Sequence, residues 1–274
     1  MSNRGGGNLV RSCLGLLALM LIAVPAAMAE KYASIVVDAD TNEVLHARYA
    51  DEPRYPASLT KAMTLYMVFD ALDAGEISLN EQIKVSAHAA SQPPSALRLR
   101  AGSTISVGDA ISALVTKSAN DVAVVIAERL GGSESRFATL MTAKAKSLGM
   151  TRTTFRNASG LPDTRQLSTA RDMAILAEHL LEDHAGYYHY FSTGSFQWGK
   201  RKYDNHNELL KTVKGVDGIK TGYTRASGFN LMASAVRDNR RVIAIMFGGS
   251  TSKSRNAHVT DLIEAAYPTS IVSD

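Results

Sequence analysis

Strand-like segments near both ends of the chain enclose a mostly helical middle, and this order constrains the fold more than any other feature. Two segments near the N-terminus, 33–38 and 43–48, are joined by a short polar turn typical of a β-hairpin. Three more, 215–221, 228–236 and 241–249, are rich in Val, Ile, Phe and Met. The order predicts an α/β (α+β) fold, with one antiparallel sheet completed by both termini and flanked by helices.

The middle of the chain follows helical periodicity. An apolar helix is expected to begin at Ser58 and to end near Ala74, and an amphipathic helix is expected at about 254–266. Because no repeat or low-complexity linker follows residue 30, we expect a single domain at 30–270, with a mostly helical insertion at about 76–200. Further helices are predicted at 107–116, 122–130 and 168–181.

The first 29 residues have the three parts of a secretory signal peptide. Arg4 and Arg11 give a basic start, 14–24 is apolar, and Ala27-Met28-Ala29 is a small-residue cleavage site. The apolar run is short for a bilayer-spanning helix, so we expect cleavage before Glu30, with an uncleaved N-terminal anchor as the alternative. Cleavage predicts a secreted chain in the periplasmic or cell-wall space.

Removal of this segment changes what the composition implies. The only cysteine, Cys13, would be lost, so the mature chain would have no thiol for a disulfide or a cysteine-bound metal. Loss of Arg4 and Arg11 would lower the net charge from +4 to +2. No basic run with interleaved aromatic residues occurs, so a nucleic acid is not an expected partner.

A serine and a lysine stand three residues apart where the apolar helix begins, in Pro56-Ala57-Ser58-Leu59-Thr60-Lys61. A helix start offers unpaired backbone N–H donors, and a lysine one turn later lies on the same side of the helix. Burying that lysine as an unpaired cation is costly, so it either turns to water or serves chemistry. The same spacing recurs in Ser250-Thr251-Ser252-Lys253, which we interpret as a solvated loop.

Two more short motifs follow in the sequence. Ser118-Ala119-Asn120 lies between two helical segments, and Lys220-Thr221-Gly222 lies on a strand-like segment. Taken singly, the first is better explained as an N-cap cluster and the second as a strand ending in a glycine turn. The first pattern also recurs, in Ser254-Arg255-Asn256.

In this order, the three motifs resemble those of the penicillin-binding proteins and serine β-lactamases. The segments 157–162, 205–210 and 218–224 narrow the resemblance to the low-molecular-mass D-alanyl-D-alanine carboxypeptidases, and it extends over about 32–267. The resemblance implies a penicillin-binding transpeptidase-like fold with one D,D-peptidase domain. It also implies a serine-type D-alanyl-D-alanine carboxypeptidase that removes the terminal D-alanine from peptidoglycan stem peptides, without a cofactor or a metal.

The same resemblance implies a role for each motif residue. Ser58 would be acylated, with Lys61 as its base, and Ser118 would relay a proton while Asn120 orients the lysine. The Lys220-Thr221-Gly222 strand would bind the terminal carboxylate, and the backbone N–H groups of Ser58 and Tyr223 would form the oxyanion hole. Arg255 is either a further carboxylate-binding residue or a solvated surface arginine.

β-Lactam antibiotics are expected inhibitors. Class A β-lactamases use an additional glutamate for deacylation, and no glutamate occurs between Glu134 and Glu178. We therefore expect penicillin to be trapped, with D,D-endopeptidase and then β-lactamase activity as alternatives. Little sequence follows the last helix, so no stable membrane anchor is expected.

Two rival interpretations remain. A zinc peptidase could use the histidines at 179, 184 and 189 with the acidic residues near them. However, the chain has no His-Glu-x-x-His motif, and a solvated helical face explains these residues better. The other rival is a wall-binding protein that kept the fold and lost turnover.

Overall fold

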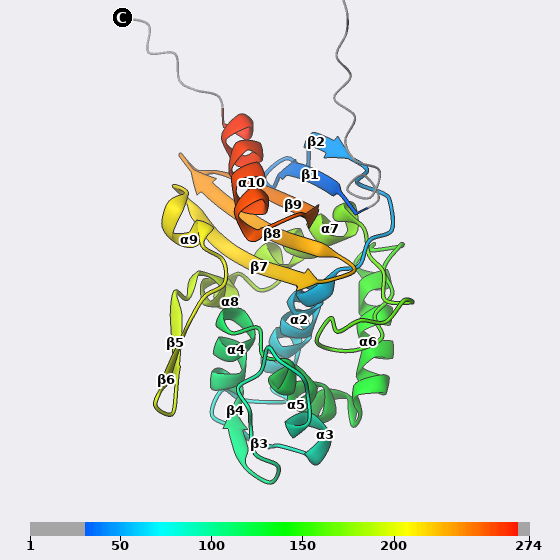
Figure 1. The fold of residues 1–274 in the computed structure, drawn as a ribbon, viewed down its shortest axis with the longest axis vertical. Helices are drawn as coiled ribbons and strands as arrows, with labels where there is room; N and C mark the ends of the chain where they lie inside the picture. Colours follow the sequence, from blue (N-terminus) through cyan, green and yellow to red (C-terminus); the bar gives the residue numbers. More distant parts are fainter. Residues whose placement is uncertain (1–30, 268–274) are drawn as a thin grey trace, which may run out of the picture.

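The computed structural model describes residues 31–267, so the predicted signal peptide at 1–29 lies outside the described residues. A five-stranded antiparallel sheet, in the order β2-β1-β9-β8-β7, forms one end of the molecule (Figure 1). In it, β1 (Ala33–Asp38) pairs with β9 (Arg240–Gly249), which confirms the predicted sheet built from both ends of the chain. The other strands are β2 (Val44–Arg48), β7 (Val216–Thr224) and β8 (Gly228–Arg237).

The sheet is covered on both faces because successive side chains point to opposite sides. In β9, Val242 packs with Val259 of α10 (Ser252–Ala266). The next residue, Ile243, belongs instead to the main core on the other face. On that face α7 (Ala170–Glu182) packs against β1 and β9. Figure 1 shows α10 in front of the sheet and α7 behind it.

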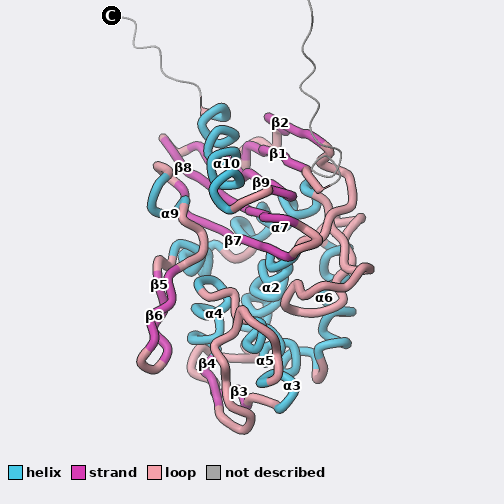
Figure 2. The backbone as a smooth tube through the Cα atoms, in the orientation of Figure 1, coloured by secondary structure: helices cyan, strands magenta, loops and turns pink. Residues whose placement is uncertain are grey.

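The central helix is α2 (Thr60–Asp73), which is buried along most of its length. Such a helix is apolar on nearly every side, as its sequence predicted. It contacts α4 (Val107–Thr116), α5 (Asn120–Gly131) and α6 (Glu134–Ser147). Figure 2 shows this helical layer in cyan beside the sheet in magenta.

Several helix boundaries agree with local signals. α4 has the predicted bounds, and the Ser106 side chain accepts a hydrogen bond from Asp109 N at 3.0 Å. α7 begins after Thr169, whose side chain accepts from Asp172 N at 3.0 Å. Both contacts lie within a single turn, so local side chains set where these two helices begin.

The sequence did not predict two small sheets in the middle of the chain. β3 (Gln82–Lys84) pairs with β4 (Thr104–Ser106), and β5 (Ser195–Trp198) pairs with β6 (Arg201–Asp204). Strands this short are hard to recognise from periodicity. The single domain at 30–270 with its insertion stays a prediction. The remaining short elements are η1 (Ala57–Leu59), α3 (Ala87–Ala90), α8 (Ala185–Tyr188), η2 (His189–Ser192) and α9 (Leu209–Thr212).

Candidate active site

Ser58 lies in η1, the 3-10 turn that leads directly into α2, as expected for a serine at the start of a buried helix. β7 passes beside this turn at Gly222. A Cβ built on Gly222 would lie 3.0 Å from Pro56 O and 3.1 Å from Ser58 N, which is closer than side chains normally pack. The glycine therefore lets the backbone of β7 approach the backbone of Ser58.

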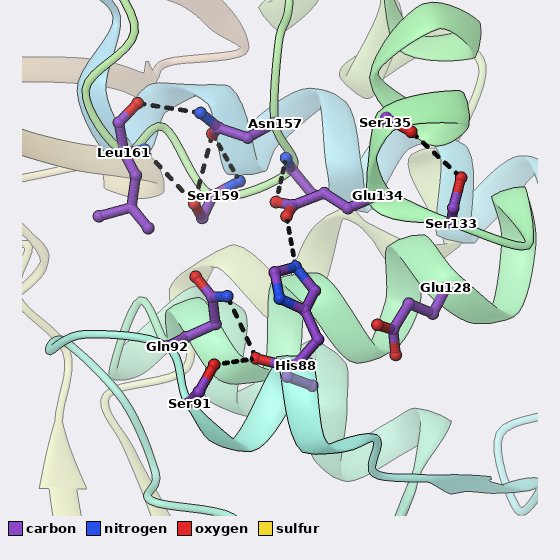
Figure 3. Close-up of polar contacts among 12 residues, drawn as sticks. His88, Ser91, Gln92, Glu128, Ser133, Glu134, Ser135, Asn157, Ser159 and Leu161 are labelled. Carbon is purple, nitrogen blue, oxygen red and sulfur yellow. Dashed lines mark hydrogen bonds and ion pairs between the residues drawn. The ribbon is translucent and has the colours of Figure 1, made fainter.

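The loop of residues 157–161, called the 157–161 loop below, also packs against η1. Asn157 holds it together, since its side chain accepts from Gly160 N at 2.7 Å and donates to Leu161 O at 3.0 Å (Figure 3). Gly160 has a φ of +86°, and a Cβ there would overlap the carbonyl group of Ala57. Only glycine permits this close approach.

Lys61 is fully buried, so the alternative that it turns to water is wrong. Its Nζ lies 3.2 Å from Ser58 Oγ. It donates to Asn120 Oδ1 at 2.8 Å and to Ser159 O at 2.5 Å. One side chain of α2 thus joins the serine turn, the start of α5 and the 157–161 loop.

The surroundings of Lys61 favour its neutral form. Burial and, second, the charge of Lys220 hold the pKa of Lys61 well below its usual 10.5, while Asp121 and Glu134 oppose this shift. A neutral amine has two N–H donors and one lone pair. The two carbonyl oxygens accept the donors, which leaves the lone pair for the hydroxyl of Ser58.

Ser118 has a positive φ of 57°, is 4% exposed, and its Oγ has no hydrogen-bond partner among the described residues. A strained backbone and an unpartnered buried hydroxyl are common features of functional sites. α5 begins at Asn120, and its N-cap Ala119 has no side-chain cap hydrogen bond, so the interpretation of this motif as an N-cap cluster is wrong. Asn120 Nδ2 donates to Pro93 O at 3.0 Å, which aims the amide oxygen at Lys61.

Two buried cations lie on the sheet side of the site. Lys220 is 1% exposed, and burial together with Arg255 lowers its pKa to about 7. Arg255 is 3% exposed, so the alternative of a solvated surface arginine is wrong. Its Nη1 donates to Asn230 O at 2.9 Å and its Nε to Asn256 Oδ1 at 2.8 Å. Burial lowers the pKa of Arg255 to about 10, and Glu208 opposes this.

A cleft of about 370 Å³ opens where these elements meet. Among the described residues that line it, none is an aspartate or a glutamate. His206 lines the cleft, and its pKa is lowered to about 4, first by desolvation of the ring and then by the charges of Lys220 and Lys117. A cleft that has nearby cationic side chains and no carboxylate in its described lining suits an anionic ligand. Its lining includes Ser58, Ser118, Asn120, Thr221, Gly222, Tyr223 and Arg255, all of them predicted.

Lys61 and Lys220 are buried behind this lining. Tyr223 is 56% exposed, and its ring lies 4.2 Å from that of Phe229, centroid to centroid. The sequence did not single out Ser159, because its contact with Lys61 uses a backbone carbonyl. The only sequence signal for Ser159 was that it lies within 157–162, one of the segments that resemble the family.

The histidines of the zinc interpretation are engaged elsewhere. His179 Nδ1 lies 2.9 Å from Asp183 Oδ2. His184 Nδ1 lies 3.0 Å from Asp73 Oδ2, and this ring is buried and not part of a solvated face. Within residues 31–267, no three His, Cys, Asp or Glu side chains gather as a metal site would require.

None of the helices within 31–267 combines the length and apolarity that crossing a membrane would need.

Comparison with known proteins places this geometry in a family. The model of the family Peptidase_S11, described as D-alanyl-D-alanine carboxypeptidase, matches residues 22–251. D-alanyl-D-alanine carboxypeptidase DacF of Bacillus subtilis is 38% identical over 247 residues, covering 87% of this chain and 62% of the relative. DacC of Escherichia coli, of the same description, is 38% identical over 239 residues, covering 85% and 60%. The chain thus spans about three-fifths of the length of these curated relatives.

Solved structures have the same fold. Penicillin binding protein 5 from Haemophilus influenzae superposes with a TM-score of 0.82 at 34% identity, covering 85% of this chain and 69% of that one. Penicillin-Binding Protein D2 from Listeria monocytogenes, in its cefotaxime-bound form, gives 0.79 at 32% identity, covering 87% and 98%. The match to the family model and these relatives extends over most of the chain. This chain therefore belongs to the D-alanyl-D-alanine carboxypeptidase family of serine peptidases.

Proposed function

We propose that this protein is a serine-type D-alanyl-D-alanine carboxypeptidase, which removes the terminal D-alanine of peptidoglycan stem peptides through an acyl-enzyme on Ser58. One observation carries the proposal: the Nζ atom of the buried Lys61 lies 3.2 Å from Ser58 Oγ. A serine is a poor nucleophile until a base removes its proton. A lysine kept neutral by burial can be that base.

In the acylation step, Ser58 Oγ attacks the carbonyl carbon of the penultimate D-alanine while Lys61 Nζ takes the hydroxyl proton. Negative charge then develops on the carbonyl oxygen, where backbone N–H donors stabilise it. The N–H groups of Ser58 and Tyr223 are proposed for this role. The close approach of Gly222 to Ser58 N supports it, because Tyr223 is the next residue on the same strand.

Collapse of this intermediate breaks the peptide bond, and the leaving amine needs a proton. Ser118 is proposed to pass that proton from Lys61 to the amine, because its buried hydroxyl has no partner among residues 31–267. The free D-alanine then leaves, and a water molecule takes its place. Lys61 removes a proton from the water as the water oxygen attacks the ester carbonyl carbon. The bond from that carbon to Ser58 Oγ then breaks, Lys61 returns the proton to Ser58 Oγ, and the shortened peptide leaves.

The terminal carboxylate is proposed to bind beside Lys220, Thr221 and Arg255. With a pKa of about 7 in the free site, Lys220 loses its charge easily. A carboxylate within a few ångströms favours the charged form of a lysine, so binding raises this pKa. Substrate and cation therefore stabilise each other.

β-Lactams present a carbonyl and a carboxylate in a similar arrangement and are proposed to acylate Ser58. Their leaving group remains tethered and obstructs the approach of water. No carboxylate among the described lining residues replaces the glutamate that class A β-lactamases use. The penicilloyl-enzyme is therefore expected to persist.

The site of action is proposed to be the periplasmic or cell-wall space, reached after cleavage of the signal peptide at 1–29. The sequence of that segment supports this proposal. Peptidoglycan, which carries the stem peptides, lies outside the cytoplasm.

The test is to incubate the purified protein with pentapeptide and with cross-linked muropeptides and to weigh the products. Release of one D-alanine from the pentapeptide supports the proposal, and cleavage of the cross-link alone supports an endopeptidase. Excess penicillin should give a burst of about one equivalent followed by slow turnover. Sustained hydrolysis of penicillin without release of D-alanine would identify a β-lactamase instead.

A further inference from the structure

A glutamate at the start of α6 contacts the 157–161 loop. Glu134 is the first residue of α6, and its Oε1 accepts a hydrogen bond from Ala158 N at 3.2 Å. Its Oε2 lies 3.2 Å from His88 Nε2 on α3. Figure 3 shows Glu134 between the histidine and the loop, with a dashed contact to each.

These contacts connect Glu134 to Lys61, the proposed catalytic base, through Ala158 and Ser159 of the loop. Ala158, whose N–H binds Glu134, directly precedes Ser159, and Ser159 O accepts a hydrogen bond from Lys61 Nζ. Ala158 O accepts from Thr64 Oγ1, also on α2, at 2.7 Å. Ala158 and Ser159 are fully buried, so no water replaces a lost contact at low cost.

Glu134 is not required as a cap for its own helix. Ser133 is the N-cap of α6, and its Oγ accepts from Arg136 N at 3.2 Å. A carboxylate in the first turn adds a small favourable interaction with the helix dipole. That interaction does not explain why both oxygens of Glu134 point away from the helix, toward Ala158 and His88.

We propose that Glu134 is a positioning residue for Lys61, which fixes Ala158 and thereby the Ser159 carbonyl, and that His88 holds Glu134 in this orientation. The inference rests on the proposed role of Lys61 as the base. The acceptor is a carboxylate that is mostly shielded from water, with a side chain 17% exposed. Hydrogen bonds to such charged acceptors are stronger than those between neutral groups.

The charge of Glu134 gives the proposal a signature that a purely structural role would not have. Burial lowers the pKa of Lys61 most, and three charged groups act on it as well: Lys220 lowers this pKa, whereas Asp121 and Glu134 raise it. A neutral base works only above its own pKa. Removal of the Glu134 charge should therefore move the acid limb of the acylation profile to lower pH.

The experiment measures the rate of acylation by a fluorescent penicillin from about pH 5 to about pH 10. Glu134→Gln keeps an oxygen for Ala158 N, so it should retain most of the plateau rate, with its acid limb at lower pH. Glu134→Ala should lower the plateau rate by about tenfold as well, because the loop loses its support. His88→Ala should lower it by about twofold, and should add nothing in the Glu134→Ala background.

Glu128→Gln and Glu128→Ala are the matched controls. Glu128 lines a surface hollow together with His88 and Glu134. It accepts from Ser86 Oγ at 2.9 Å, and no hydrogen bond joins it to the 157–161 loop among the described residues. Both variants should have the wild-type profile. Glu134 variants that fold, judged by circular dichroism, but keep the wild-type acid limb would overturn the inference. If Glu134→Ala does not fold, Glu134→Gln alone decides.

Failure of the proposed function would look different. In that case the wild-type protein would not be acylated, or a Ser58→Ala variant would still be labelled. Failure of the inference alone would leave the wild-type protein acylated on Ser58, with Glu134 and Glu128 variants alike.

Discussion

Two regions of this molecule have the same serine–lysine spacing and opposite surroundings. Ser58 and Lys61 lie where η1 passes into α2, and Lys61 is fully buried. Ser250 directly follows β9, whereas Lys253 lies in the first turn of α10 and not in the predicted loop, and both are exposed. There the serine hydroxyl lies 3.0 Å from Ser254 Oγ, next to the capping box of α10.

The difference shows that the spacing alone gives no nucleophile. In the first region, desolvation and Lys220 lower the pKa of Lys61, and two carbonyl oxygens orient its amine toward Ser58. In the second region, water surrounds the lysine and no comparable enclosure exists among the described residues. Reactivity of the pair therefore depends on burial and on contacts from other segments.

The largest expected difference between the regions is at the serines. Ser58→Ala should lower acylation by a fluorescent penicillin by at least about 10⁴-fold, because the attacking oxygen is absent. Ser250→Ala should be labelled like the wild-type protein. Labelling intensity on a gel, followed over time, measures both. Labelling of a folded Ser58→Ala variant would disprove the assignment of the nucleophile.

The lysines should differ next. Lys61→Arg should lower acylation by about 10³-fold, because a guanidinium cannot act as a neutral base at any working pH. Lys253→Arg should have no effect. The same labelling assay applies, and thermal unfolding establishes that each variant is folded. Since an arginine could fail to fit the buried site, Lys61→Met serves as a second variant with the same expected loss.

The buried and the exposed lysines should also differ in how much they affect the free energy of unfolding. The pKa of Lys220 is lowered to about 7 in the folded protein, so the unfolded chain binds more protons at neutral pH. This destabilisation is fully present below about pH 7 and fades as the pH rises toward the usual 10.5.

Lys220→Met should therefore raise the free energy of unfolding by roughly 3 kcal/mol near pH 7, with a smaller gain near pH 10. Lys253→Met should change it by less than about 0.5 kcal/mol at either pH. Urea unfolding at the two pH values measures the effect. Equal stability of the wild-type and Lys220→Met proteins at neutral pH would contradict it.

The smallest expected effect is that of Lys220→Arg, which tests whether Lys220 acts as a cation while Lys61 acts as a base. Lys220→Arg should lower kcat/KM by only about tenfold near pH 7, because a positive charge is still present for the substrate carboxylate. In the wild-type protein, kcat/KM should fall as the pH rises through about 7, where Lys220 loses its proton in the free enzyme. The arginine variant should lack that alkaline limb. A loss as large as that of Lys61→Arg would show that the two roles are not divided in this way.

The sequence by itself determined the features that depend on neighbouring residues. The bounds of α4 and the cap of α7 follow from side chains within one turn. The strand pattern at both ends determined the antiparallel sheet, and the three motifs identified part of the lining of the cleft, namely Ser58, Ser118, Asn120, Thr221 and Gly222. Helical spacing also placed Ser58 and Lys61 on the same side of the chain.

Only the tertiary structure decided what surrounds these residues. The partners of Lys61 are 59 and 98 residues away, on α5 and the 157–161 loop. Arg255 could be solvated or buried by sequence, and packing against β8 buried it. The strained φ of Ser118 and the short β5–β6 hairpin likewise had no clear local signal. Desolvation is a property of a packed environment, and segments far apart in the sequence create it, so it is absent from any local pattern.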